Sequence, residues 1–369
     1  ILRILLVQFN VLNLSAYMDS DLATGDSLAI YKNYWWLLSS ITLNNFYLHG
    51  FYTHGRTYDG KFKALLIFEA VTVSYMIFGA AAAGARVFTT ASSPGISLMS
   101  EGISYISGAQ CPAVFVNIMR GGPGLGGILP SQADYLQATK GMGHGDFRLL
   151  VMAPASVQEA VTMVMQAFPL AEKYRNPVII LGDGLIGQMM EPVEFFDDLK
   201  TEATNKNAWA TNGMDHRGSN QRNLVKSLFL DPEALNQNNL TLKAKYDQMK
   251  KEEVRFETYN TDTDYQVLIV SYGTMSRVCR TAIDNMKKEG LEVGMVRPQT
   301  LFPFPEKPVL AAAEKKSCKT VASIEMSMGQ MIEDIQISVQ GKKPVHWYGK
   351  CGGDVPTPEE VTEFVHTLL

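Results

Sequence analysis

The sequence has few cysteines, no excess of basic residues and no long uncharged apolar run. Its four cysteines are scattered without a CxxC pair, so no zinc or iron–sulfur motif is visible and a reducing, cytoplasmic location is expected. The formal net charge of -4 does not give the basic footprint of a nucleic-acid-binding protein. The uncharged run from Ala70 to Ala85 is shorter than the about 20 residues of a membrane-spanning helix. His49 and His54 have no carboxylate or cysteine close by, so no metal site is expected there. Neither nucleic acid nor a membrane is expected as a partner.

Strand and helix patterns alternate through most of the chain. Short apolar runs at Pro112–Met119, Leu149–Ala153 and Val178–Leu181 predict buried strands, and the segments between them predict helices. Ser156 followed by Glu159 is a capping-box pattern and predicts the start of one helix. The 369 residues are enough for two domains. The alternation predicts an α/β fold whose parallel sheet carries helices on both faces.

Composition divides the chain into three parts. Residues 1–196 are expected to form the first α/β domain, although periodicity is poor up to about residue 64. Residues 197–263 are polar and charged, which predicts a linker carrying one exposed helix from Asp231 to Arg255. Residues 264–369 predict a smaller α/β domain with four strands.

A glycine-rich turn follows the strand at Pro112–Met119. Arg120 stands where that strand ends, and the turn after it contains Gly121, Gly122, Pro123, Gly124, Gly126 and Gly127. Ligands of open α/β sheets bind at the carboxyl ends of strands, and a guanidinium fork suits a planar carboxylate. The pattern predicts an anion site at Arg120. A plain turn with Arg120 in a surface ion pair is the open alternative.

Four segments, in this order and spacing, resemble one protein family. They are Gly79–Leu98, Arg120–Gly124, Gly143–Asp146 and Ser327–Met331. They resemble the α subunit of 2-oxoacid:ferredoxin oxidoreductases, and most of all the branched-chain, 2-oxoisovalerate type. The resemblance covers the chain from about residue 78 to its end, and the part before residue 78 does not fit. It implies a thiamine pyrimidine-binding domain followed by a domain like the transketolase C-terminal domain.

The resemblance also implies an activity and partners. The reaction would be the oxidative decarboxylation of a branched-chain 2-oxoacid to an acyl-coenzyme A, with electrons passed to ferredoxin. Thiamine diphosphate would be shared with a β subunit that carries the diphosphate, Mg²⁺ and an iron–sulfur cluster, and a ferredoxin-like subunit would complete the complex. Apolar faces at Gly79–Gly84 and Ser327–Met331 are expected to meet these partners. A non-catalytic scaffold role, and 2-oxoglutarate or pyruvate as the substrate, stay open as alternatives.

Two site residues of the family can be aligned with positions in this sequence. Arg120 matches the carboxylate-binding arginine beside the cofactor. The thiamine-activating glutamate falls at Ala70 in an ungapped count, and the adjacent Glu69 is the candidate catalytic and cofactor-binding carboxylate. One residue on a helix is a turn of about 100°, so Glu69 is no simple replacement. Either the subunit cannot activate thiamine, or residues 1–78 differ from those that the gene encodes; the abrupt loss of the pattern favours the second explanation.

Three further positions complete the predicted site. Ser93 and Gly95 are expected to bind the cofactor. His144, in a glycine-flanked turn, is a candidate proton donor, with a structural histidine as the alternative. Gly182–Gly184 begins like a diphosphate–Mg²⁺ motif, but Pro192 interrupts the helix that should follow. The segment is therefore interpreted as a turn at a strand end.

Overall fold

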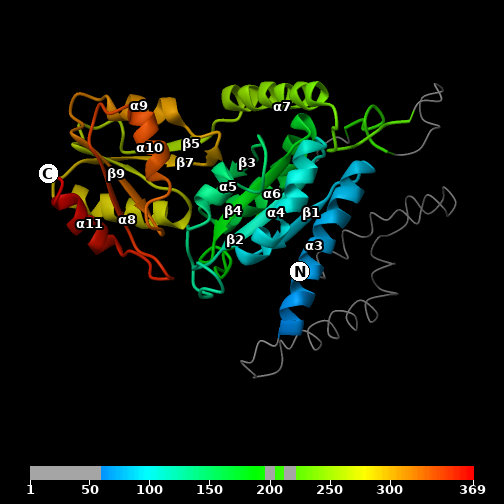
Figure 1. The fold of residues 1–369 in the computed structure, drawn as a ribbon. Helices are drawn as coiled ribbons and strands as arrows, with labels where there is room; N and C mark the ends of the chain where they lie inside the picture. Colours follow the sequence, from blue (N-terminus) through cyan, green and yellow to red (C-terminus); the bar gives the residue numbers. More distant parts are fainter. Residues whose placement is uncertain (1–59, 196–203, 212–221) are drawn as a thin grey trace.

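The computed structural model describes residues 60–195, 204–211 and 222–369 (Figure 1). The helices are α3 (Gly60–Ala82), α4 (Pro94–Gly108), α5 (Tyr135–Lys140), α6 (Val157–Tyr174), α7 (Pro232–Glu252), α8 (Gly273–Lys288), α9 (Glu306–Ala313), α10 (Ile332–Val339) and α11 (Pro358–His366). The strands are β1 (Phe88–Ala91), β2 (Ala113–Met119), β3 (Leu150–Met152), β4 (Pro177–Asp183), β5 (Phe256–Tyr259), β6 (Val267–Val270), β7 (Val293–Pro298), β8 (Thr300–Phe302), β9 (Thr320–Glu325) and β10 (Val345–Gly349). None of the helices in these ranges combines the length and apolar character needed to cross a bilayer. His49 and His54 lie outside the described residues.

The first sheet has the strand order β1-β2-β4-β3-β8, and β1 to β4 run parallel. Successive residues of β2 point to opposite faces, as the pleat of a strand requires. Phe115 packs in the hydrophobic cluster that contains α3 and α4, whereas Val114 and Val116 pack in the cluster that contains α6 and α7. Helices therefore cover both faces of a parallel sheet, as the sequence predicts.

The second sheet has the order β10-β9-β6-β7-β5. Its four predicted strands, β6, β7, β9 and β10, are parallel. β6, β7 and β9 are buried between α8 with α11 on one face and α9 with α10 on the other, whereas the edge strand β10 is partly exposed. One hydrophobic cluster runs from the α3–α4 side of the first sheet into the α9–α10 side of the second. The two α/β units thus share a continuous core.

The carboxyl ends of the two sheets face each other. Asp183, at the end of β4, accepts hydrogen bonds from the Thr274 backbone N–H (2.9 Å) and the Thr274 hydroxyl (2.7 Å) at the start of α8. Gln132 donates to the Tyr272 carbonyl (2.9 Å) and accepts from the Met326 N–H (2.9 Å), after β6 and β9 respectively. Because ligand sites of such sheets lie beyond the carboxyl ends of strands, this seam is where a site is expected.

Two short strands differ from the sequence prediction. β5 lies within residues 197–263, the segment predicted to be a linker, and pairs antiparallel with β7. β8 lies within residues 264–369, yet pairs antiparallel with β3 of the first sheet. Both are edge strands of three or four residues, and such short strands carry too little periodicity to be identified locally.

Two local interpretations also need correction. Helix α7 is not simply exposed, since Leu242, Tyr246 and Met249, spaced on one helical face, are buried against the first sheet. The Ser156 hydroxyl accepts from the Glu159 N–H (3.1 Å), but the Glu159 carboxylate bonds Ala155 and Arg297 rather than completing a capping box.

The segments Gly79–Gly84 and Ser327–Met331 were expected to face partners. Ala81, Ala82 and Met331 are buried inside this chain, because they pack into its own core. Ala83 and Met328 are exposed, Met328 at 82%. Large apolar side chains are also exposed on α3 and in the glycine-rich turn, for example Phe68 (68%) and Ile128 (79%).

Candidate functional site

Arg120 lies one residue beyond β2, at the carboxyl edge of the first sheet. Its backbone N–H donates to the Ser93 hydroxyl (3.0 Å), and its Nη2 donates to the Leu125 carbonyl (3.1 Å). The Nε atom is buried and, within the described ranges, has no hydrogen-bond partner. A buried N–H without an acceptor is costly, so the guanidinium suits an external anion such as a carboxylate.

The glycine-rich turn closes upon itself beside Arg120. The Gly121 N–H donates to Leu129 (3.0 Å), and the Gly121 carbonyl accepts from Gly127 (2.8 Å). A Cβ on Gly126 would lie 1.8 Å from that carbonyl, and Gly126 has a φ of +56°. Glycine is therefore required at this position, and residues 122–129 reach into solvent as one exposed loop.

The second α/β unit holds this loop from the other side. A Cβ built on Gly121 would lie 3.2 Å from the Gly352 carbonyl carbon, and one on Gly353 would lie 2.2 Å from the Leu129 Cβ. Gly352 and Gly353 belong to the turn between β10 and α11. A side chain at Gly121 or Gly353 would therefore crowd the other unit, and this close approach couples the position of the loop to the second sheet.

Ser93 and Gly95 lie at the start of α4, beside Arg120. The Ser93 hydroxyl is already engaged, since it donates to the Asp134 carboxylate (2.5 Å) and accepts from the Arg120 N–H. A Cβ on Gly95 would lie 2.9 Å from the Ala91 Cβ, so packing alone accounts for that glycine. Contact of either residue with a cofactor stays a prediction.

Two residues of this cluster were not predicted as site residues. Asn117 is fully buried in β2, and Asp134 precedes α5. Asn117 donates to the Asp134 carboxylate (2.9 Å) and accepts from the Ser93 N–H (2.8 Å). The available signal was one amide side chain within the otherwise apolar run at Ala113–Met119. Such a buried polar group needs partners, and here it finds them at the site.

Glu69 lies on α3 and is half-buried. Helices α3 and α4 run in the same direction, because Ser74 faces Gly102 while the ring of Phe78, four residues later, meets the ring of Tyr105 edge-on. Glu69 precedes Ser74 by five residues, about 7.5 Å along a helix. This step leads toward the start of α4, so Glu69 lies near the end of the sheet that carries Arg120.

His144 lies away from these residues, on the solvent side of α4. Its imidazole Nδ1 is 3.6 Å from a Glu101 carboxylate oxygen and 3.5 Å from the Ser104 hydroxyl, and its side chain is 78% exposed. In the part of the chain that the structure describes, no hydrogen bond or ion pair joins His144 to Arg120. A catalytic role for His144 therefore stays a prediction.

Asp183, in the segment Gly182–Gly184, accepts hydrogen bonds from other groups of this chain. Besides its two bonds from Thr274, it accepts from the backbone N–H groups of Leu185 (3.1 Å) and Ile186 (3.2 Å). Burial raises the pKa of Asp183, although these donors act in the opposite direction. The geometry fits the strand-end turn that the sequence predicts. The structure adds that this turn links the two sheets.

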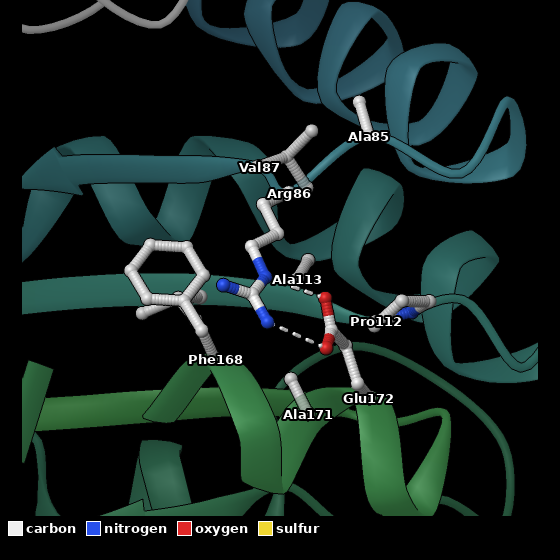
Figure 2. Close-up of a pocket in the computed structure, with 9 residues that line it drawn as sticks. Ala85, Arg86, Val87, Pro112, Ala113, Phe168, Ala171 and Glu172 are labelled. Atoms are coloured by element: carbon white, nitrogen blue, oxygen red, sulfur yellow. Dashed lines mark hydrogen bonds and ion pairs between the residues drawn. The ribbon is translucent and has the colours of Figure 1, made fainter. Parts of the chain in front are cut away.

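A small pocket lies at the opposite, amino edge of the first sheet. Figure 2 shows Arg86 and Glu172 facing each other across it, with a nitrogen–oxygen distance of 2.7 Å. Its cavity volume of about 10 Å³ has room for roughly one water molecule. Burial acts to raise the pKa of Glu172, but hydrogen bonds from Arg86 and Lys206 lower it to about 2. This place is a structural ion pair and is too small for a 2-oxoacid.

Comparisons with known proteins match both halves of the chain. The family model described as "Pyruvate flavodoxin/ferredoxin oxidoreductase, thiamine diP-bdg" matches residues 69–258, and "Pyruvate:ferredoxin oxidoreductase core domain II" matches residues 266–361. Ketoisovalerate oxidoreductase subunit VorB of Methanothermobacter thermautotrophicus is 46% identical over 293 residues, which are 79% of this chain and 81% of that protein. 2-Oxoglutarate synthase subunit KorA of Archaeoglobus fulgidus is 33% identical over 307 residues, covering 82% of this chain and 84% of that protein.

Two solved structures share the fold. A 2-oxoglutarate:ferredoxin oxidoreductase from Magnetococcus marinus, with 2-oxoglutarate, coenzyme A and succinyl-CoA bound, superposes with a TM-score of 0.65 at 24% identity. The alignment covers 81% of this chain but only 56% of that longer one. A split gene transketolase, described as an inactive beta4 tetramer, gives a TM-score of 0.50 at 13% identity, over 81% of this chain and 80% of the other. These likenesses agree with a thiamine-type α/β domain followed by a transketolase-C-terminal-like domain.

Proposed function

The chain belongs to the 2-oxoacid:ferredoxin oxidoreductase family, and from that premise we propose that it binds the substrate carboxylate within a thiamine-dependent, multi-subunit enzyme. The reaction would convert a branched-chain 2-oxoacid, coenzyme A and oxidised ferredoxin into CO₂, an acyl-coenzyme A and reduced ferredoxin. The single observation that carries the proposal is Arg120, whose buried Nε lacks a partner among the described residues at the carboxyl edge of the first sheet. We place the complex in the cytoplasm.

A branched-chain substrate is favoured by the surroundings of Arg120. The loop at residues 121–129 contains no charged residue, and it exposes Leu125 (60%), Ile128 (79%) and Leu129 (51%). Apolar side chains beside a carboxylate-binding arginine suit an isopropyl group better than a second carboxylate, which would need another cation. Identities of 46–47% to ketoisovalerate oxidoreductase subunits, against 31–33% to archaeal 2-oxoglutarate synthase subunits, point the same way. 2-Oxoglutarate and pyruvate are the alternatives.

Thiamine diphosphate, when bound, supplies the electron sink for decarboxylation. On this chain Glu69 would face its pyrimidine ring, since α3 brings it toward the edge of the sheet that carries Arg120. We assign the diphosphate and Mg²⁺ to a β subunit, because the Asp183 carboxylate already accepts four hydrogen bonds from this chain. We assign the iron–sulfur clusters to the β subunit and a ferredoxin-like subunit, because this sequence has no CxxC pair. This chain's own contribution is to orient the substrate carboxylate and to cover it with the loop at residues 121–129.

Replacement of Arg120 in the complete complex tests the proposal. Arg120→Ala should remove about 2–4 kcal/mol of transition-state stabilisation, because a charge-assisted contact at a desolvated site is lost. The value of kcat/KM should therefore fall roughly 30- to 1000-fold. Arg120→Lys should recover little, since an ammonium does not reproduce the guanidinium fork. The thermal unfolding temperature of both variants should match that of the parent. Parent-like kinetics in Arg120→Ala would instead favour the non-catalytic scaffold role.

A further inference from the structure

Behind Arg120, three residues from three separate segments close a ring of hydrogen bonds. The Ser93 N–H donates to the side-chain oxygen Oδ1 of Asn117 (2.8 Å), and the side-chain Nδ2 of Asn117 donates to the Asp134 carboxylate (2.9 Å). The Ser93 hydroxyl donates to the same carboxylate oxygen, Oδ2 (2.5 Å). The Arg120 N–H is attached to the ring through its bond to the Ser93 hydroxyl (3.0 Å). The ends of β1 and β2 and the start of α5 are thereby fixed to one another.

The Ser93 side chain does not cap its helix but takes part in this ring. Ser93 is the N-cap residue of α4, and N-cap serines normally accept a hydrogen bond from the first turn of their helix. Here no such bond is present, and the hydroxyl lies between Asp134 and the Arg120 N–H instead. The local capping preference has been overridden by contacts with residues that lie 27 and 41 positions further along the chain.

We propose that Asp134 is a positioning residue for Arg120 and acts through Ser93. The inference rests on the proposed carboxylate-binding role of Arg120. A carboxylate only accepts hydrogen bonds, so the Ser93 hydroxyl must direct its hydrogen to Asp134 and present a lone pair to the Arg120 N–H. Asp134 therefore sets the direction of both bonds. With its backbone held in this way and its Nη2 held by Leu125, Arg120 directs its remaining N–H groups to the substrate.

The first test uses the complete complex with 3-methyl-2-oxobutanoate as the substrate. Asp134→Ala should raise KM roughly tenfold, the equivalent of one lost charged hydrogen bond, and should change kcat by less than about threefold. Ser93→Ala should have the same effect, and it keeps the test valid if Asp134→Ala fails to fold. Asp146→Ala is the matched control, because Asp146 is exposed and takes part in no hydrogen bond with the described residues. A parent-like KM in both Asp134→Ala and Ser93→Ala would overturn the inference.

A double-mutant cycle separates positioning from a general structural effect. If Asp134 acts through Arg120, Asp134→Ala should leave KM unchanged, within about twofold, in a complex that already carries Arg120→Ala. A full tenfold rise in that background would overturn the positioning role while leaving the proposed function intact. Parent-like kinetics in Arg120→Ala alone would overturn the proposed function itself, and this inference with it. The two failures are thus distinguishable.

Discussion

The contact between Gly353 and Leu129 predicts that one methyl group in the second α/β unit will disturb the site in the first. A Cβ on Gly353 would lie 2.2 Å from the Leu129 Cβ, whereas ordinary contact begins near 3.4 Å. Gly353→Ala should therefore displace Leu129 by roughly 1.2 Å. The Leu129 carbonyl accepts from the Gly121 N–H (3.0 Å), and Arg120 pairs with Pro130, so the displacement passes directly to the arginine.

The expected magnitude follows from this geometry. A misplacement of about 1 Å in a catalytic constellation can cost on the order of 10²-fold, so kcat/KM of the Gly353→Ala complex should fall by roughly that factor. Gly352→Ala serves as the control, because Gly352 also has a positive φ (+72°) but has nothing within 4 Å of an added Cβ. Its backbone strain of about 1–2 kcal/mol should lower the unfolding temperature, while kcat/KM stays within about fivefold of the parent.

The assay is steady-state reduction of ferredoxin by the complete complex, with the 2-oxoacid concentration varied. Because the φ of Gly353 (+104°) is less favourable for alanine than that of Gly352, a second comparison is needed. Leu129→Gly combined with Gly353→Ala should recover part of the lost kcat/KM, since the clashing side chain is gone. Equal kinetics of the Gly353→Ala and Gly352→Ala complexes would show that the second α/β unit does not hold the loop in place.

Three further outcomes are expected. The pKa of Glu172 falls from 4.5 to about 2 in the folded chain, so its ion pairs stabilise the fold above pH 4.5 and this contribution disappears as the pH drops toward 2. Glu172→Gln should remove that part of the pH dependence of the urea midpoint, and an unchanged slope would contradict the assignment. Asp183→Asn should destabilise the fold by about 1–3 kcal/mol in thermal unfolding, because the amide hydrogens meet the Thr274 N–H, and Thr274→Val should cost less. Glu69→Gln should slow exchange of the thiamine C2 proton in the complex, whereas parent-like exchange would exclude Glu69.

Much of the fold could be predicted because its signals are local. The apolar runs Pro112–Met119 and Val178–Leu181 predict buried parallel strands, and the observed strands, Ala113–Met119 and Pro177–Asp183, begin and end within a few residues of them. Arg120 could be located at the carboxyl end of a strand for the same reason. Helix α7 was found but was predicted to be exposed, since charged residues on one face concealed the apolar spacing of Leu242, Tyr246 and Met249.

The contacts that complete the site could not be predicted, because they join distant segments. Nothing near Ser93 indicates that its hydroxyl leaves the helix end to bind Asp134, which is 41 residues away in sequence. Gly353 likewise gives no local sign of packing on Leu129. Only the amide of Asn117 within an apolar strand was a visible hint that polar partners converge there. Tertiary contacts of this kind override local preference.

We propose that this chain contributes substrate binding to an enzyme that works only as a complex. The most direct measurement is ferredoxin reduction with 3-methyl-2-oxobutanoate and coenzyme A, by the isolated chain, the complete complex and a complex carrying Arg120→Ala. We expect no turnover by the chain alone, rapid turnover by the complete complex and a roughly 30- to 1000-fold lower kcat/KM in the variant. Turnover by the isolated chain, or parent-like kinetics of the variant complex, would contradict it.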